Sequence, residues 1–287
     1  MVNENKWDFY EPFSPELFEE LLIFIKANFY PTTFSGVREQ QKSEKNSKPR
    51  LILSFDDGFK NFINVAMPLL EKYKIKVNQN VIPDSIQTGL PPFNITAKNY
   101  ICNAPQELIE KLEIPGINFR LRSNDRLKLG IKISRLIKSR KISEQKELEK
   151  FVIPQFHAWD KFSTIPMMNI REIKQCAATH ELGAHSFEHA SMQYEDDEYF
   201  QNDLMRCKDY FNEVIGIPAL IYAFPNGSYR EEQLHGPLAL GYENVLTVNN
   251  SFSRAGNKIH DRIGFHAASK NEVLFRAVGG FSKIQCS

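Results

Sequence analysis

Two neighbouring carboxylates in this 287-residue chain have the position and spacing of a catalytic or metal-binding pair. Asp56 and Asp57 follow the apolar run 51–55 and precede a glycine. Two adjacent anions repel each other, so both stay charged only beside a cation or strong hydrogen-bond donors. A bound metal ion would supply that cation. The alternative is an ordinary turn, because Asp-Asp-Gly is also favourable turn chemistry.

A second motif adds nitrogen ligands. His185 and His189, in the stretch Gly-Ala-His-Ser-Phe-Glu-His, also follow a strand-like run. On a helical turn, side chains four residues apart point the same way and are able to grip one ion. One aspartate with two histidines leaves metal positions open for water and substrate, which is the catalytic arrangement. The spare aspartate would then accept a proton from that water. Unrelated surface or hydrogen-bonded histidines are the alternative interpretation.

Two later segments are weaker candidates. Residues 221–227, Ile-Tyr-Ala-Phe-Pro-Asn-Gly, form an apolar run that ends in a Pro/Gly turn. Such a turn is able to aim a backbone N–H into a site, although a plain loop would have the same composition. Residues 262–266, Arg-Ile-Gly-Phe-His, resemble a late strand that ends in a histidine, and a lone histidine is most often structural.

Strands and helices must alternate if these motifs are to meet. Hydrophobic periodicity predicts strands at 51–55, 77–81, 181–185, 219–223, 243–248 and 261–265. It predicts helices at 15–29, 60–73, 169–179, 196–215, 229–239 and 270–278. This alternation favours a parallel sheet or a barrel. Each motif then follows a strand, at the carboxyl edge where such folds bind ligands.

The domain organisation predicted is a single α/β domain over 1–287, with an N-terminal helical extension at about 1–49 and an insertion at about 84–165. Within the insertion, residues 120–150 contain 11 Lys or Arg and 4 Asp or Glu. A solvated helical face is one interpretation of this basic segment. The other is contact with a membrane surface or an anionic carrier lipid. Because the basic residues lack interleaved aromatic residues, nucleic acid is not an expected partner.

The composition fits a globular chain, with 42% hydrophobic and 25% charged residues and a net charge of +1. No C-x-x-C occurs among its four widely spaced cysteines, which argues against a zinc finger and favours a reducing compartment. No apolar run approaches the roughly 18 residues of a membrane helix. The first residues lack the basic and apolar regions of a signal peptide. We therefore expect a cytoplasmic protein; its oligomeric state is left open.

In this order the four segments resemble the motifs of the polysaccharide deacetylase family, the NodB-homology carbohydrate esterases. The family's T-F-D-D-G is similar to residues 54–58, and its H-[ST]-x-x-H to residues 185–189. Its third motif, in the form F-A-Y-P-[YN]-G, resembles residues 222–227, and its last, an apolar run ending in His, resembles 263–266. The resemblance extends from Leu51 to His266 and is interrupted by the insertion.

The resemblance implies a fold and an activity. The fold would be a distorted (β/α)7 barrel. The activity would be metal-dependent hydrolysis of N-acetyl groups on a sugar, a polysaccharide or its precursor, with an acetylated carbohydrate as substrate. The divalent metal would be zinc, with cobalt, nickel or manganese also compatible with the ligands. An O-acetyl carbohydrate esterase and a catalytically inactive carbohydrate-binding relative are the alternatives.

The resemblance also implies a role for each motif residue. Asp56 would be the general base and His266 the general acid. The backbone N–H of Asn226, in the turn that also contains Phe224 and Pro225, would face the oxyanion. The metal ligands would be Asp57, His185 and His189.

Two departures from the family pattern concern the neighbours of the base. Many members carry an arginine, which holds the catalytic aspartate, where this chain has Ala223. We expect Arg262 to reach the same carboxylate from the last strand. The Asp/Trp motif of other members has no counterpart, because the two tryptophans, Trp7 and Trp159, both precede Asn226.

Overall fold

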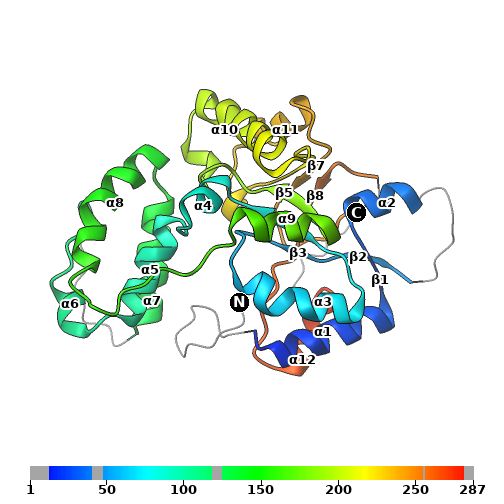
Figure 1. The fold of residues 1–287 in the computed structure, drawn as a ribbon, viewed down its shortest axis with the longest axis horizontal. Helices are drawn as coiled ribbons and strands as arrows, with labels where there is room; N and C mark the ends of the chain where they lie inside the picture. Colours follow the sequence, from blue (N-terminus) through cyan, green and yellow to red (C-terminus); the bar gives the residue numbers. More distant parts are fainter. Residues whose placement is uncertain (1–12, 41–47, 118–124, 255, 281–287) are drawn as a thin grey trace.

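A six-stranded parallel sheet forms the centre of the computed structural model, which describes residues 13–40, 48–117, 125–254 and 256–280. Each strand pairs with the next one along the chain, in the order β3-β4-β5-β6-β7-β8, and the sheet is curled (Figure 1). The strands are β3 Ser54–Phe55, β4 Asn78–Val81, β5 Glu181–Ala184, β6 Ile221–Ala223, β7 Asn244–Leu246 and β8 Ile259–His260. Sequential parallel pairing requires crossovers, and helices provide all of them except the one from β7 to β8, which has no helix among its described residues.

A second, two-stranded parallel sheet continues the curl. Strand β1 (Tyr30–Thr32) pairs with β2 (Arg50–Ile52). Residues 51–55, predicted as one strand, are therefore divided: β2 pairs with β1 and β3 pairs with β4. The carbonyl of Leu53, between them, accepts a hydrogen bond from Asn78 N at 3.0 Å. The architecture is the distorted α/β barrel expected from the sequence. Strands β2 and β3 follow each other almost directly along the chain and together occupy one bent strand position of the barrel.

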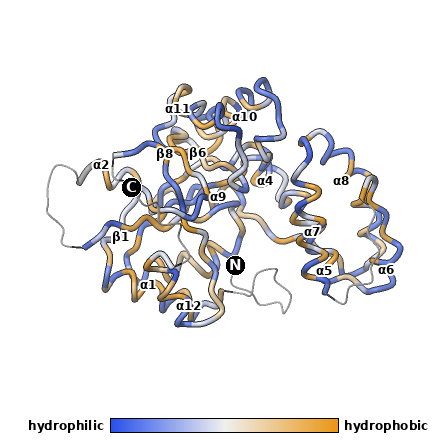
Figure 2. The backbone as a smooth tube through the Cα atoms, turned by 180° about the vertical axis from the view of Figure 1, so that it is seen from behind, coloured by the Kyte–Doolittle hydropathy of each residue, from blue (hydrophilic) through white to orange (hydrophobic). Residues whose placement is uncertain are grey.

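Helices cover the outside of the curled sheet (Figure 1). They are α1 Pro15–Asn28, α2 Phe34–Gln40, α3 Met67–Tyr73, α9 Ile170–Thr179, α10 Asp197–Tyr210, α11 Gly236–Ala239 and α12 Lys270–Ala277. Helix α1 begins as predicted, because Ser14 Oγ accepts a hydrogen bond from Leu17 N at 3.2 Å. It buries one apolar face, including Leu22 and Ile25, against the barrel, and apolar and polar positions alternate along the helices (Figure 2).

The insertion forms a helical lobe beside the barrel (Figure 1). Its helices are α4 Pro83–Thr88, α5 Phe93–Asn103, α6 Gln106–Glu110, α7 Arg126–Lys138 and α8 Ile142–Phe156. Helices α5 to α8 enclose a hydrophobic core of their own, in which Tyr100 stacks on Phe156 with ring centroids 4.0 Å apart. A hydrogen bond of 2.6 Å from Ile142 N to Glu195 Oε1 connects α8 to the barrel. The basic segment thus lies on a folded lobe.

Two further predicted elements differ from the structure. The helix expected at 229–239 is broken into a short turn at Glu231–Gln233 and the short helix α11, since Pro237 lacks the N–H that a continuous helix needs. The strand expected at 261–265 is instead β8, Ile259–His260, paired with β7. Beyond it, side chains replace the strand ladder: Asp261 Oδ1 accepts hydrogen bonds from Thr247 Oγ1 at 2.6 Å and Asn249 Nδ2 at 2.7 Å.

Across the described segments, we find no helix with both the length and the apolar character needed to cross a bilayer.

Candidate active site

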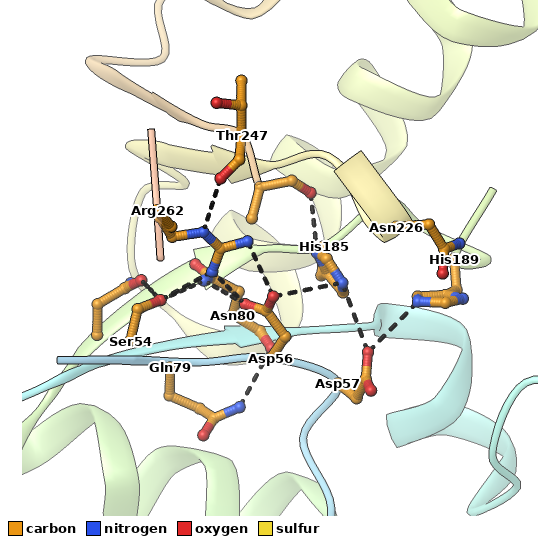
Figure 3. Close-up of polar contacts among 12 residues, drawn as sticks. Ser54, Asp56, Asp57, Gln79, Asn80, His185, His189, Asn226, Thr247 and Arg262 are labelled. Atoms are coloured by element: carbon orange, nitrogen blue, oxygen red, sulfur yellow. Dashed lines mark hydrogen bonds and ion pairs between the residues drawn. The ribbon is translucent and has the colours of Figure 1, made fainter. Parts of the chain in front are cut away.

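The strands β3 and β5 bring the acidic pair and the two histidines together (Figure 3). Asp57 Oδ1 lies 3.5 Å from His185 Nε2 and 3.4 Å from His189 Nε2. Asp57 has a φ of 75°, followed by Gly58 at 83°, so the chain turns sharply where β3 ends. A non-glycine residue rarely adopts this conformation, and such strain is concentrated at functional sites.

The histidine motif is a loop, so of the two alternatives that the sequence leaves open, a loop or a helical turn, the structure has the loop. Ser186 and His189 have φ values of 56° and 59°, in the left-handed region that interrupts a helix. The two imidazoles nevertheless converge, with ring centroids 5.2 Å apart. The convergence therefore comes from two left-handed residues and not from helical periodicity.

A buried carboxylate on helix α10 holds this loop. Asp203 Oδ1 accepts hydrogen bonds from Ser186 Oγ and Phe187 N, both at 2.8 Å. Its Oδ2 accepts one from Tyr222 Oη at 2.9 Å. Burial raises the pKa of Asp203 to about 6, against the lowering effect of these donors. Sequence reasoning missed Asp203, because its helix shows only an ordinary amphipathic pattern.

The three residues Asp57, His185 and His189 fit a metal ion. One ligand atom from each lies within 4.8 Å of the other two. Asp57 Oδ1 is buried and receives no hydrogen bond of normal geometry from the described residues, so it is an acceptor without a donor. Burial lowers the pKa of His185 although Asp56 and Asp57 oppose the shift. The ring is therefore neutral, as a metal ligand must be.

The orientation of His185 is also fixed. Its Nδ1 lies 2.9 Å from the backbone oxygen of Ala223, at the end of β6. Donation from Nδ1 to this carbonyl leaves Nε2, the atom nearest Asp57, as the nitrogen with a free lone pair. Metal-binding histidines are usually oriented by such a second hydrogen bond.

Asp56 has a different environment from its neighbour. Arg262 donates two hydrogen bonds to it, from Nη1 to Oδ1 at 2.8 Å and from Nη2 to Oδ2 at 2.9 Å. Burial alone would raise the pKa of Asp56, but the charge of Arg262 and hydrogen bonds from Arg262 and Asn80 hold this pKa well below its usual range. Asp56 Oδ2 lies 3.9 Å from His185 Nε2. A fixed, ionised carboxylate thus stands beside the candidate metal ligands.

Asn80 is a further neighbour that sequence reasoning missed. Its Nδ2 donates to Asp56 Oδ1 at 2.8 Å. Gly183, on the adjacent strand β5, leaves room for this amide, since a Cβ there would lie only 2.1 Å from Asn80 Oδ1. The signal was present in the sequence as Asn-Gln-Asn, a polar run in a strand that is buried at all four positions. Buried polar side chains in a strand require partners.

The third motif forms a tight turn after β6. Asn226 has a φ of 59°, and its side chain donates from Nδ2 to Ser191 Oγ at 3.1 Å. Its Oδ1 accepts a hydrogen bond of 2.8 Å from Lys138 Nζ, on the insertion. Pro225 and Phe224 are buried, with the Phe224 ring 5.2 Å from the ring of Tyr222. The turn is therefore linked both to the histidine loop and to the insertion.

His266 is placed differently from the other motif residues. Its side chain is exposed, and its Nε2 lies 3.5 Å from Arg276 Nη2 on helix α12. It follows an extended segment and not the strand predicted for 261–265. The structure thus brings together Asp56, Asp57, His185, His189 and Arg262, whereas His266 packs beside α12.

A family model described as polysaccharide deacetylase matches residues 43–245. The chain belongs to the polysaccharide deacetylase family. This match covers most of the chain and includes the first three motifs. It supports a carbohydrate deacetylase, a hydrolase whose substrate class is acetylated carbohydrate. Among curated proteins, no match was found.

Solved structures of deacetylases have the same fold. The Streptococcus pyogenes deacetylase PplD, in complex with acetate, is 18% identical with a TM-score of 0.59, and the match covers 91% of this chain and 85% of that one. IcaB from Ammonifex degensii is 15% identical with a TM-score of 0.54, over 92% and 89% of the two chains. A de-N-acetylase from Aggregatibacter actinomycetemcomitans is 12% identical with a TM-score of 0.56, over 91% and 88%.

Proposed function

We propose that this deacetylase is a metal-dependent hydrolase that removes N-acetyl groups from a sugar, a polysaccharide or its precursor. The observation that carries the proposal is the pair of unlike carboxylates. Asp57 Oδ1 lies between two imidazole nitrogens and accepts no hydrogen bond from the described residues, whereas Arg262 holds Asp56 beside it by hydrogen bonds. One of the two acids is suited to ligate a cation and the other to accept a proton.

Asp57, His185 and His189 would hold a divalent metal, with zinc the first candidate for two nitrogens and a carboxylate, and cobalt, nickel or manganese also compatible. When bound, the ion supplies a Lewis acid that lowers the pKa of a water molecule toward about 7.

Asp56 would act as the general base, because its carboxylate is ionised and its position is fixed by Arg262. The backbone N–H of Asn226 would donate to the carbonyl oxygen of the acetyl group as negative charge develops there. Loss of one such donor typically costs about 3 kcal/mol of transition-state stabilisation. The family resemblance implies that His266 protonates the departing amine; its ring is exposed and lies beside Arg276 of α12, so this role rests on the resemblance alone. General acid and base groups each contribute about 10²–10⁴ in rate.

The test is the variant Asp56→Asn. It keeps the shape of the side chain and removes the basic oxygen, so we expect about one equivalent of metal by elemental analysis. Acetate release from acetylated oligosaccharides should fall by at least about 10²-fold. The matched control is Asp160→Asn, an exposed position on the insertion. Near-parental turnover in Asp56→Asn would contradict the assignment of the base.

The same assay separates the alternatives. Acetate release from N-acetylated sugars with none from O-acetylated sugars supports the amidase activity proposed, and the reverse result would make the protein an esterase. A purified protein that takes up no divalent metal and releases no acetate would be a carbohydrate-binding relative.

A further inference from the structure

One cationic side chain from the insertion reaches the site described above. Lys138 is the last residue of α7, and its Nζ donates to Asn226 Oδ1 at 2.8 Å. Asn226 in turn contacts Ser191, which lies two residues after His189. The ammonium group therefore stands at the rim of the proposed metal site, brought there from a separate hydrophobic lobe.

The surroundings of Lys138 strengthen its electrostatic influence. Its side chain is partly buried, and burial lowers its pKa, as does the neighbouring charge of Arg135. The negative charge of Asp57 acts in the opposite direction, which places Lys138 within electrostatic range of a proposed ligand. A charge in partly desolvated surroundings interacts more strongly with a partner than a fully hydrated one does.

Further basic residues continue from Lys138 along the same face of α7. Positions 128, 132, 135 and 138 follow helical spacing, so their side chains form one stripe. The stripe borders an open hollow of about 460 Å³, lined by Lys128, Ile131, Lys132, Arg135 and Leu136. This volume is within the usual range for ligand sites.

Most of the positive charge on this stripe is not neutralised. Lys128 pairs with Asp125 at 2.8 Å, but in the described part of the chain Lys132 and Arg135 form no ion pair. A lysine ammonium has three donors, and the contact with Asn226 uses one of them. The remaining donors, with the Arg135 guanidinium, are suited to an oxyanion.

We propose that Lys138, together with Arg135, is a specificity-determining pair that binds an oxyanion, phosphate or carboxylate, carried by the acetylated carbohydrate. The inference rests on the proposed function, because it assigns the substrate class of the same site. An anionic glycan is favoured over a neutral one because Lys138 Nζ contacts Asn226 of the site and Arg135, Lys132 and Lys128 continue its positive charge along α7. It is favoured over a membrane surface because the Lys138 amine is turned inward to Asn226.

The experiment compares three probes on the full-length protein loaded with zinc. They are the methyl glycoside of N-acetylglucosamine, its 6-phosphate, and the corresponding acetamido uronic acid. Dissociation constants are measured by calorimetry, so the result does not depend on turnover. We expect the parent to bind at least one anionic probe about tenfold or more tightly than the neutral one, the size of one charge-assisted hydrogen bond. The phosphate and carboxylate arms identify which oxyanion is preferred.

Variants then assign the preference to Lys138. Lys138→Met should reduce the ratio of the affinity for the anionic probe to the affinity for the neutral probe to about one. Lys138→Arg should retain the preference, which also shows that the position tolerates substitution. Lys150→Met, at an exposed lysine on α8, is the matched control and should behave as the parent.

Two results would overturn the inference: a parent that does not prefer either anionic probe, or a Lys138→Met variant that keeps the parental ratio. Because these are binding measurements, a failed acetate assay would contradict the proposed hydrolysis and leave the oxyanion result standing. Acetate release without any preference for the anionic probes would support the proposed hydrolysis and contradict the oxyanion inference.

Discussion

Two adjacent carboxylates at the end of β3 are given unlike properties by their partners. Arg262 and Asn80 surround Asp56 with donors, whereas Asp57 faces two imidazoles and keeps an unpaired buried oxygen. Neighbouring acids usually repel, and here separate partners from different segments of the chain stabilise each one. The residue-level feature that matters is therefore the partner of each acid and not the Asp-Asp sequence itself.

We predict that Arg262→Met lowers kcat by about 10²-fold, because Asp56 loses both bonds that fix its direction. Arg262→Lys should recover only part of this loss, since an ammonium cannot form the paired contact of a guanidinium. Acetate release and metal content measured together check the prediction, with Arg171→Met, exposed on α9, as the control. A variant that loses its metal in parallel with its activity would show that Arg262 supports the fold of the site instead.

The motif residues could be predicted from sequence, and their supporting residues could not. Asp56, Asp57 and the two histidines are short-range patterns at strand ends. Asp203 and Lys138 lie on elements far along the chain, and nothing local distinguishes them from ordinary polar residues, whereas Asn80 belongs to an unusual polar run in a buried strand. The segment before His266 is a different case. Its apolar run predicted a strand, but Phe265 packs on Phe13 outside any sheet, with ring centroids 5.6 Å apart.

At the scale of elements, helix α10 supports the proposed metal site through one buried side chain. Asp203 connects α10 to the histidine loop and to β6 through Ser186, Phe187 and Tyr222. The loop contains two left-handed residues, which are costly unless their surroundings hold them. A carboxylate that accepts three hydrogen bonds supplies this restraint, at the cost of burying a group that ionises.

We predict that burial of the ionisable Asp203 side chain makes the free energy of unfolding depend on pH. Its pKa rises from 3.8 in the unfolded chain to about 6 in the fold, so the folded state binds the proton more tightly. This contribution to stability is complete below about pH 4 and is lost as the pH rises through about 6, a change of about 3 kcal/mol.

Asp203→Asn, which cannot ionise, removes this change. The free energy of unfolding of the parent, measured in urea without metal, should therefore fall relative to the variant between about pH 4 and pH 7. Asp209→Asn, exposed on the same helix, is the control. A constant difference between the parent and Asp203→Asn across this range would refute the prediction.

At the scale of the whole molecule, the described residues of the insertion have a hydrophobic core separate from the two apolar clusters of the barrel. The junction includes Ile142 of α8, whose side chain packs in the larger barrel cluster and whose N–H donates to Glu195. The ion pair between Glu188, inside the histidine motif, and Lys146 of α8 also links the insertion to the loop that carries the proposed metal ligands. Regions with separate cores often open separately.

We therefore predict that Phe156→Ala destabilises the insertion more than the barrel. Phe156 is fully buried against Tyr100, and removing such a ring typically costs about 3–5 kcal/mol. Hydrogen exchange should accelerate across α5, α7 and α8, while amides of β4, β5 and β6 keep their protection. Equal acceleration in both regions would mean that the chain unfolds as one unit.

The clamp on Asp56 joins residues 206 positions apart in the chain. During synthesis, the aspartate, its amide neighbour Asn80 and both histidines emerge long before the arginine does. A nascent or truncated chain that ends short of residue 262 would contain every proposed ligand yet leave the proposed base unrestrained. Full competence for hydrolysis would then require translation beyond residue 262, because only then is the proposed base restrained.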